Sequence, residues 1–176
     1  STDQGICSYN YETEDFSRYQ IKGNTKDDVC FLNTSDGMLL AACSNGLYRY
    51  NEQDSLFVPF LLDKEKPHVR YFAEDGDKTL WIDTNKGLMR YSLEKKQFVS
   101  LPTLIQPFTQ QCNNAVLISS NQLLFNTNND FFVYHIQSNT LCNLSKDLEV
   151  KDFRCAATDH TGNIWVGTEY GIFVFN

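Results

Sequence analysis

Short apolar segments separated by polar turns run along the whole chain, and they recur with a fixed period. One set opens on Gly or Asp and continues with four mainly apolar residues; its members are residues 5–9, 46–50, 87–91, 130–134 and 171–175. Their first residues lie 41, 41, 43 and 41 positions apart. A spacing this constant over 176 residues indicates a structural repeat.

The repeat contains further matching positions. A second apolar segment precedes each of the last four segments of this set, at residues 39–43, 80–84, 123–127 and 164–168. In addition, an apolar residue lies seven positions after the closing tyrosine of each of the first four segments of the set, at Phe16, Phe57, Phe98 and Leu141. These segments are rich in β-branched and aromatic residues and are bounded by turn residues, which predicts strands. We name the four strands of a repeat A to D, for example A at 69–74, B at 80–84, C at 87–91 and D near Phe98.

No segment of 10–15 residues between these strands has helical periodicity, so strands that are adjacent in sequence are expected to pair with each other. Repeats of four antiparallel strands predict an all-β fold, a β-propeller built of four-stranded blades. We expect the end of one blade at 1–22, blades at 23–63, 64–105 and 106–148, and an incomplete blade with strands A to C at 149–176. These would be about four blades of a larger ring of about seven. Trp81 and Trp165 should pack between blades.

Charge and hydropathy exclude several partners. The formal net charge is −7, and no basic run is longer than Lys95-Lys96, which argues against nucleic-acid binding. No apolar run approaches the roughly 20 residues that cross a bilayer, so we expect no direct membrane contact from this segment.

The six cysteines form no Cys-x-x-Cys pair, so most are expected to be small buried hydrophobic residues. One alternative stays open. If Asp36 and Gly37 formed a two-residue hairpin turn, Cys30 would lie directly opposite Cys43, and a cross-strand disulfide could form there.

Catalysis is not expected. A pair of carboxylates could support glycosidic hydrolysis, but the carboxylates here follow the turns of the repeat, where Asp supports the backbone; they include Glu74, Asp75, Asp77 and Asp83. No cysteine or carboxylate lies at metal-ligand spacing from any of the three histidines, His68, His135 and His160. The sequence also contains no nucleotide-binding loop. We therefore expect no cofactor and no metal site.

Residues 150–159, 162–168 and 171–175, with a second copy at 80–84 and 87–91, resemble the two-component regulator propeller repeat. That repeat forms the sensor domain of periplasmic hybrid two-component histidine kinases of the Bacteroides type. Some positions depart from the pattern, with Leu40 and Leu124 replacing Trp, Cys43 replacing Thr, and Asp130 replacing Gly. The resemblance implies a periplasmic module of an inner-membrane protein, whose kinase lies elsewhere and whose propeller helps detect oligosaccharides. A homodimer formed through the parent receptor is a second expected partner.

In a propeller the B–C and D–A loops share one face, and loops on a rigid scaffold often carry recognition. The B–C positions are Asn45, Lys86, Asn129 and Tyr170, and such polar residues with one aromatic ring suit a sugar. The alternative is that they are solvated turn residues. The long D–A connections, at 61–67 and 101–111, are further candidate sites. Two other functions stay open: a structural or protein-interaction propeller that spaces or dimerises a receptor, and the propeller of a glycan lyase or hydrolase.

Overall fold

The computed structural model describes residues 6–21, 29–60, 67–110, 112–128, 130–145 and 153–175. Over these ranges the chain forms seventeen strands and one short 3-10 turn, η1 (Gln106–Phe108). It divides into two compact units, Ser1–Arg70 and Tyr71–Asn176.

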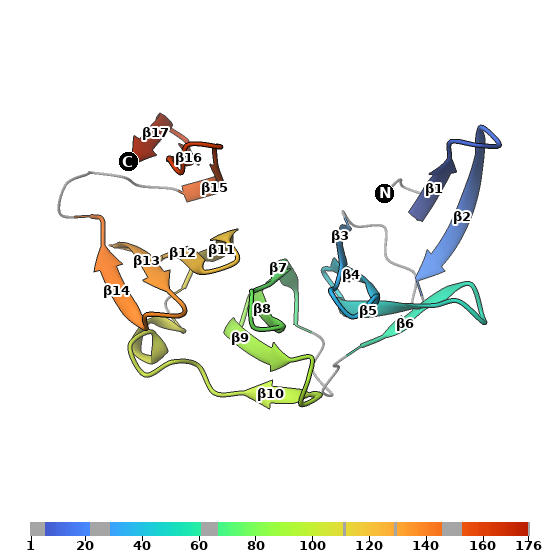
Figure 1. Ribbon diagram of the computed structural model, residues 1–176, viewed down its shortest axis with the longest axis horizontal. Coiled ribbons are helices and arrows are strands. Elements are labelled where there is room, and N and C mark those ends of the chain that lie inside the picture. Colours follow the sequence, from blue (N-terminus) through green and yellow to red (C-terminus); the bar gives the residue numbers. More distant parts are fainter. Residues whose placement is uncertain are drawn as a thin grey trace. The chain divides into compact units, whose positions relative to one another are not determined.

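The first unit is a single six-stranded sheet in the order β1-β2-β6-β5-β4-β3 (Figure 1). Neighbouring strands pair antiparallel except β2 and β6, which pair in parallel where Gln20 meets Leu56. That parallel pair was not expected from the sequence; it covers an edge of β6 whose backbone groups would otherwise lack partners. The strands are β1 (Ile6–Asn10), β2 (Asp15–Ile21), β3 (Cys30–Asn33), β4 (Leu39–Cys43), β5 (Gly46–Asn51) and β6 (Leu56–Pro59).

The expected two-residue turn between β3 and β4 is wrong, and with it the Cys30–Cys43 disulfide. The backbone closes over a longer loop, in which the Thr34 N–H donates to the Met38 carbonyl and the Gly37 N–H donates to the Thr34 carbonyl. The pairing therefore shifts by one residue, and Cys30 lies opposite Ala42. Because a shift of one residue moves a side chain to the other face of the sheet, Cys30 is exposed whereas Cys43 is buried, and both are free thiols.

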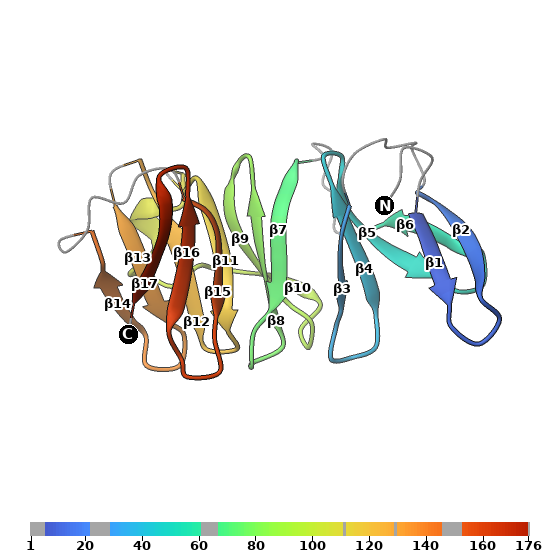
Figure 2. The ribbon, with the colours of Figure 1, turned by 90° about the horizontal axis from the view of Figure 1, so that it is seen from above.

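The second unit contains two four-stranded antiparallel sheets and one three-stranded sheet, and the strands of each sheet run side by side (Figure 2). The all-β prediction of four-stranded antiparallel sheets is confirmed. The first sheet has β7 (Val69–Glu74), β8 (Thr79–Thr84), β9 (Gly87–Ser92) and β10 (Gln97–Val99); the second has β11 (Asn114–Ser119), β12 (Gln122–Asn126), β13 (Phe131–His135) and β14 (Thr140–Asn143); the third has β15 (Phe153–Thr158), β16 (Ile164–Thr168) and β17 (Gly171–Phe175).

Two apolar cores join these three sheets. In the first, Trp81 and Leu88 of the β7–β10 sheet pack against Ala115, Phe125 and Tyr134 of the next sheet. A fully buried side chain of this size contributes about 1.5–3 kcal/mol through burial. The Trp81 ring is 1% exposed, as the sequence predicted for a residue between sheets.

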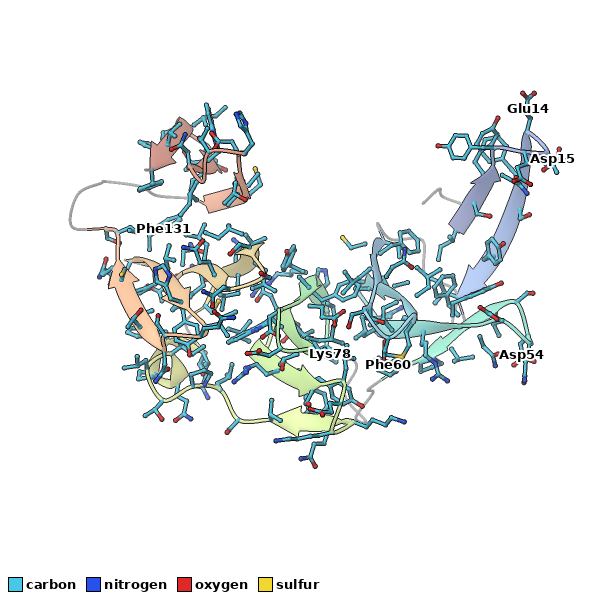
Figure 3. The ribbon with its side chains drawn as sticks, in the orientation of Figure 1. Glu14, Asp15, Asp54, Phe60, Lys78 and Phe131 are labelled. Carbon is cyan, nitrogen blue, oxygen red and sulfur yellow. The ribbon has the colours of Figure 1, made fainter. Side chains whose placement is uncertain are left out.

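The second core lies between the β11–β14 and β15–β17 sheets. Phe131, labelled in Figure 3, extends from β13 toward the β15–β17 sheet, and with Leu124 and Val133 it packs against Val166. Trp165, on the other face of that last sheet, does not follow the expectation of burial, since it is 44% exposed. No described residue forms a core with this ring, whereas its counterpart Trp81 has the whole β11–β14 sheet against it.

Candidate functional site

The turns that join strand B to strand C are built by a threonine at the end of strand B. In the β8–β9 turn the Thr84 Oγ1 donates to the Gly87 carbonyl at 2.7 Å and accepts from the Lys86 N–H at 3.1 Å. Both bonds fix the backbone, and neither uses the Lys86 side chain. The turn thus holds Lys86 in place while leaving its side chain exposed.

The same construction recurs in the other repeats. The Thr168 Oγ1 donates to the Gly171 carbonyl at 3.0 Å and accepts from the Tyr170 N–H at 3.1 Å. The Thr127 Oγ1 accepts from the Asp130 N–H at 3.1 Å. Where the first repeat has cysteine instead, the Cys43 Sγ lies 3.8 Å from the Gly46 carbonyl oxygen and donates only a weak bond.

Three of the four predicted ligand-binding residues are described, and each lies at one of these turns. Asn45, Lys86 and Tyr170 are exposed, Tyr170 to 75%, whereas Asn129 lies outside the described residues. Asn45 belongs to the first unit, and the other two belong to the second. Lys86 and Tyr170 stand on different sheets with the β11–β14 sheet between them in sequence. Their role in binding stays a prediction.

The connection at 101–111 is folded against the core over the residues that are described, up to 110. Ile105 is 1% exposed, and the Phe108 ring packs on Phe132 with the ring centroids 4.6 Å apart. A Cβ atom at Gly87 would lie 2.7 Å from the Thr109 carbonyl oxygen, so this connection passes directly over the β8–β9 turn. It thereby adds Thr109 and Gln110 to the surroundings of Lys86. Of the other connection, 61–67, all but the last residue lies outside the described part.

Two buried polar side chains lie beside these turns, and for one of them, Asp83, the expectation of a turn position is wrong, because it lies inside β8. The Asp83 side chain is 1% exposed, and its Oδ2 accepts from the Ala115 N–H of the next sheet at 3.3 Å. Asn126 occupies the equivalent position in β12, and its Oδ1 accepts from the Asn114 N–H at 3.1 Å. The signal was a polar residue at the fourth position of an otherwise apolar strand B. These bonds hold the start of β11 against the ends of β8 and β12.

An amide pair lies at the same edge of the β11–β14 sheet. The Asn113 Nδ2 donates to the Asn128 Oδ1 at 2.9 Å, and both residues are exposed. Together with Lys86 and Gln110 they give this edge of the second unit hydrogen-bond donors and acceptors. Amide and ammonium groups of this kind are the partners that sugar hydroxyls use.

Asp159 has an ionisation that its turn controls. Hydrogen bonds from Thr161 and Trp165, followed by Asn163, hold the pKa of the Asp159 carboxyl well below its usual range. These bonds favour the ionised form of Asp159. Within the described ranges no group of three His, Cys, Asp or Glu side chains is placed to hold a metal ion. Among the same residues no helix is long and apolar enough to span a bilayer.

Comparison with known proteins identified relatives by structure alone. No family model matches the chain, and no curated protein matches it. Among solved structures, the extracellular domain of BT4673, a proposed hybrid two component system from B. thetaiotaomicron, is 18% identical with a TM-score of 0.70. The match covers 89% of this chain and 21% of that one. Domains of this kind are propellers.

The fold is a β-propeller.

Two further propeller structures support this assignment. The extracellular domain of BT3049, another proposed hybrid two component system from B. thetaiotaomicron, is 17% identical with a TM-score of 0.69; the match covers all of this chain and 25% of that one. Virginiamycin B lyase from Staphylococcus aureus is 15% identical with a TM-score of 0.67; the match covers 99% of this chain and 63% of the lyase. The chain thus spans about a fifth to a quarter of the length of the two-component propellers.

Proposed function

We propose that this propeller segment belongs to the extracytoplasmic, periplasmic sensor of a hybrid two-component signalling protein and helps it detect oligosaccharides. The observation that carries the proposal is the similarity to two extracellular domains of proposed hybrid two component systems, over 89% and 100% of the chain. The regulator-propeller pattern in the sequence points to the same class of protein independently of the coordinates.

The geometry of the B–C turns supports a recognition role. Thr84 and Thr168 fix the turn backbones, so the exposed Lys86 and Tyr170 side chains are presented from a rigid base. A ligand that meets pre-organised groups loses less conformational entropy on binding. An aromatic ring offers a face to the CH groups of a sugar, and lysine and asparagine donate hydrogen bonds to its hydroxyls.

The lyase among the similar structures is the reason to keep an enzyme as a second candidate. Against it stands the position of Asp159, a carboxylate whose lowered pKa comes from hydrogen bonds within a turn.

The test is a screen of plant and host oligosaccharides against the complete sensor that contains this segment, followed by calorimetry on any ligand found. We expect at least one oligosaccharide to bind. Replacing Lys86 or Tyr170 by alanine should each weaken that binding about tenfold, or about 1.4 kcal/mol. Matched controls are Lys95→Ala, on the turn between β9 and β10, and Tyr11→Ala, whose ring is 87% exposed in the first unit. Both controls should bind as tightly as the unaltered protein.

Three results would contradict this proposal. Absence of binding across the screen would favour a propeller that spaces or dimerises a receptor without a small ligand. Equal losses in the controls and the turn variants would remove the B–C residues from the site. Turnover of any oligosaccharide or of virginiamycin B would show an enzyme instead.

A further inference from the structure

The β4–β5 turn of the first unit differs from the β8–β9 and β16–β17 turns at two positions. Strands β4 and β5 are joined by Ser44 and Asn45, and the pair that closes the turn is Cys43 and Gly46. The asparagine is followed directly by glycine, and this Asn-Gly pair occurs once in the sequence. The turn therefore combines a thiol, where the other two turns have a hydroxyl, with an asparagine that precedes glycine.

An asparagine in this position can lose its side-chain amide spontaneously. Asparagine is one of the thermolabile residues of proteins. The nitrogen of the residue that follows can attack the amide carbon, and a glycine there has no Cβ to hinder the approach. The Asn45 side chain is exposed, so water reaches its amide group. Sequence and exposure thus favour deamidation at this turn.

The reaction needs only water as a co-reactant. Hydroxide removes the proton of the Gly46 nitrogen, this nitrogen bonds to the Asn45 Cγ, and the bond from Cγ to the side-chain nitrogen breaks as ammonia leaves. Water then opens the five-membered imide ring. Cleavage of the bond between Cγ and the Gly46 nitrogen gives aspartate, and cleavage at the main-chain carbonyl carbon gives isoaspartate. Asparagine and water become an acid and ammonia, without oxidation or reduction.

Threonine hydroxyls hold the corresponding turns of the second unit. Thr84 and Thr168 each accept a bond from the N–H of the residue before the glycine and donate one to the glycine carbonyl. We call these two bonds the threonine clamp. The Cys43 Sγ lies 3.8 Å from the Gly46 carbonyl oxygen, and a thiol is a weak donor and a weak acceptor. Attack requires the backbone to rotate at Asn45, and a turn held by a thiol resists that rotation less.

Two other asparagines in turns provide internal comparisons. Asn85 lies in the β8–β9 turn and is exposed like Asn45, but it precedes Lys86 and its turn has the threonine clamp. Asn139 is exposed in the turn between β13 and β14, and its Oδ1 accepts from the Tyr134 hydroxyl at 2.8 Å. Both share the exposure of Asn45 without the glycine that follows it. They should therefore keep their amides for longer.

We propose that Asn45 is a modification site, at which attack by the Gly46 nitrogen converts the side-chain amide to aspartate and isoaspartate in the folded protein. The change adds a negative charge to the β4–β5 turn and replaces an N–H donor by an acceptor. Isoaspartate also lengthens the main chain within a two-residue turn. Because loop length sets the register of a hairpin, this product disturbs the pairing of Cys43 with Gly46. The chemistry is the same whether or not the protein binds a sugar.

The experiment incubates the protein in neutral and in mildly alkaline buffer and follows each asparagine by peptide mass spectrometry, which reads the conversion of amide to acid. Asn45 should convert at least about tenfold faster than Asn85 and Asn139, which corresponds to a barrier lower by about 1.4 kcal/mol. Alkaline buffer should speed the conversion, because the Gly46 nitrogen must lose its proton. Equal rates at Asn45 and Asn85, or an amide that stays intact at Asn45, would overturn the proposal.

Cys43→Thr tests the part that the fold plays, because it gives this turn the hydroxyl of the other two. It should slow the conversion of Asn45 about fivefold, the factor that one hydrogen bond of about 1 kcal/mol provides. In urea both proteins should convert at the same rate, since the clamp exists only in the folded chain. A Cys43→Thr protein that is folded by circular dichroism and still converts as fast as the unaltered protein would also overturn the proposal. No ligand enters these measurements, so their outcome is independent of the proposed sensor function.

Discussion

Asp75 is expected to be the polar side chain on which the β7–β10 blade depends most. It is 5% exposed, and its carboxylate accepts three hydrogen bonds, from the Trp81 Nε1 at 2.7 Å and from the Asp77 and Thr79 N–H groups at 2.9 Å each. Asp75→Ala removes both acceptor oxygens, and with them all three bonds, and it leaves the buried indole N–H and the buried Thr79 N–H without that partner. Each buried donor left unsatisfied costs about 1–3 kcal/mol, so we expect a loss of about 3 kcal/mol.

Asp159 provides a matched control, because it makes the equivalent bond to Trp165 at 2.9 Å in the β15–β17 blade. Trp165 is 44% exposed, so water can replace the carboxylate there. Asp159→Ala should therefore destabilise the protein clearly less than Asp75→Ala. The destabilisation by Asp75→Asn should lie between those of Asp159→Ala and Asp75→Ala. The amide oxygen of the new side chain can still accept the backbone bonds of the turn, whereas its amide N–H would face the Trp81 indole N–H, and two donors cannot bond to each other.

The measurement is urea unfolding followed by circular dichroism, with thermal midpoints as a check. A loss of about 3 kcal/mol corresponds to about 6–12 °C in a domain of this size. The reasoning would be refuted if Asp75→Ala and Asp159→Ala cost the same, or if Asp75→Ala cost less than about 1 kcal/mol.

Two further predictions use the same assays or NMR. In urea unfolding, Gly87→Ala should lower the free energy of unfolding clearly more than Gly171→Ala. Both glycines have positive φ, 112° and 137°, but of the two only the Cβ at Gly87 would collide with backbone, 2.7 Å from the Thr109 carbonyl oxygen. Equal losses would show that the connection at 101–111 moves aside. The Trp165 indole N–H resonance should stay constant from pH 7 to about pH 4 and shift only below that. The reason is that the pKa of Asp159 is lowered in the folded protein, so the bond from Trp165 and its stabilising contribution are lost only as the pH falls through that pKa. A shift of the resonance near pH 5–6 would contradict this.

The strands could be predicted from the sequence because the period and the pattern within each repeat agree. The segments expected at 69–74, 80–84 and 87–91 match β7, β8 and β9 within one residue at each end, and Phe98 lies in β10. A strand that buries one face must keep its apolar residues in register over its whole length, so the pattern leaves little freedom.

Turn geometry and edge pairing could not be predicted in the same way. The loop from Thr34 to Met38 is set by local hydrogen bonds, and a difference of one residue was enough to move Cys30 away from Cys43. The parallel contact between β2 and β6 joins strand edges, where backbone groups of almost any sequence can pair. The exposure of Trp165 also escaped the sequence, since its repeat position is that of the buried Trp81.

The candidate site has the same division between what folding dictates and what it leaves free. At the β8–β9 and β16–β17 turns the threonine hydroxyl and the glycine that follows make or permit the backbone bonds. The residue directly before the glycine gives its N–H to the threonine in these two turns, and its side chain differs between blades: it is Asn45, Lys86 or Tyr170. Only a loss of binding in variants that unfold normally would show that the choice serves recognition.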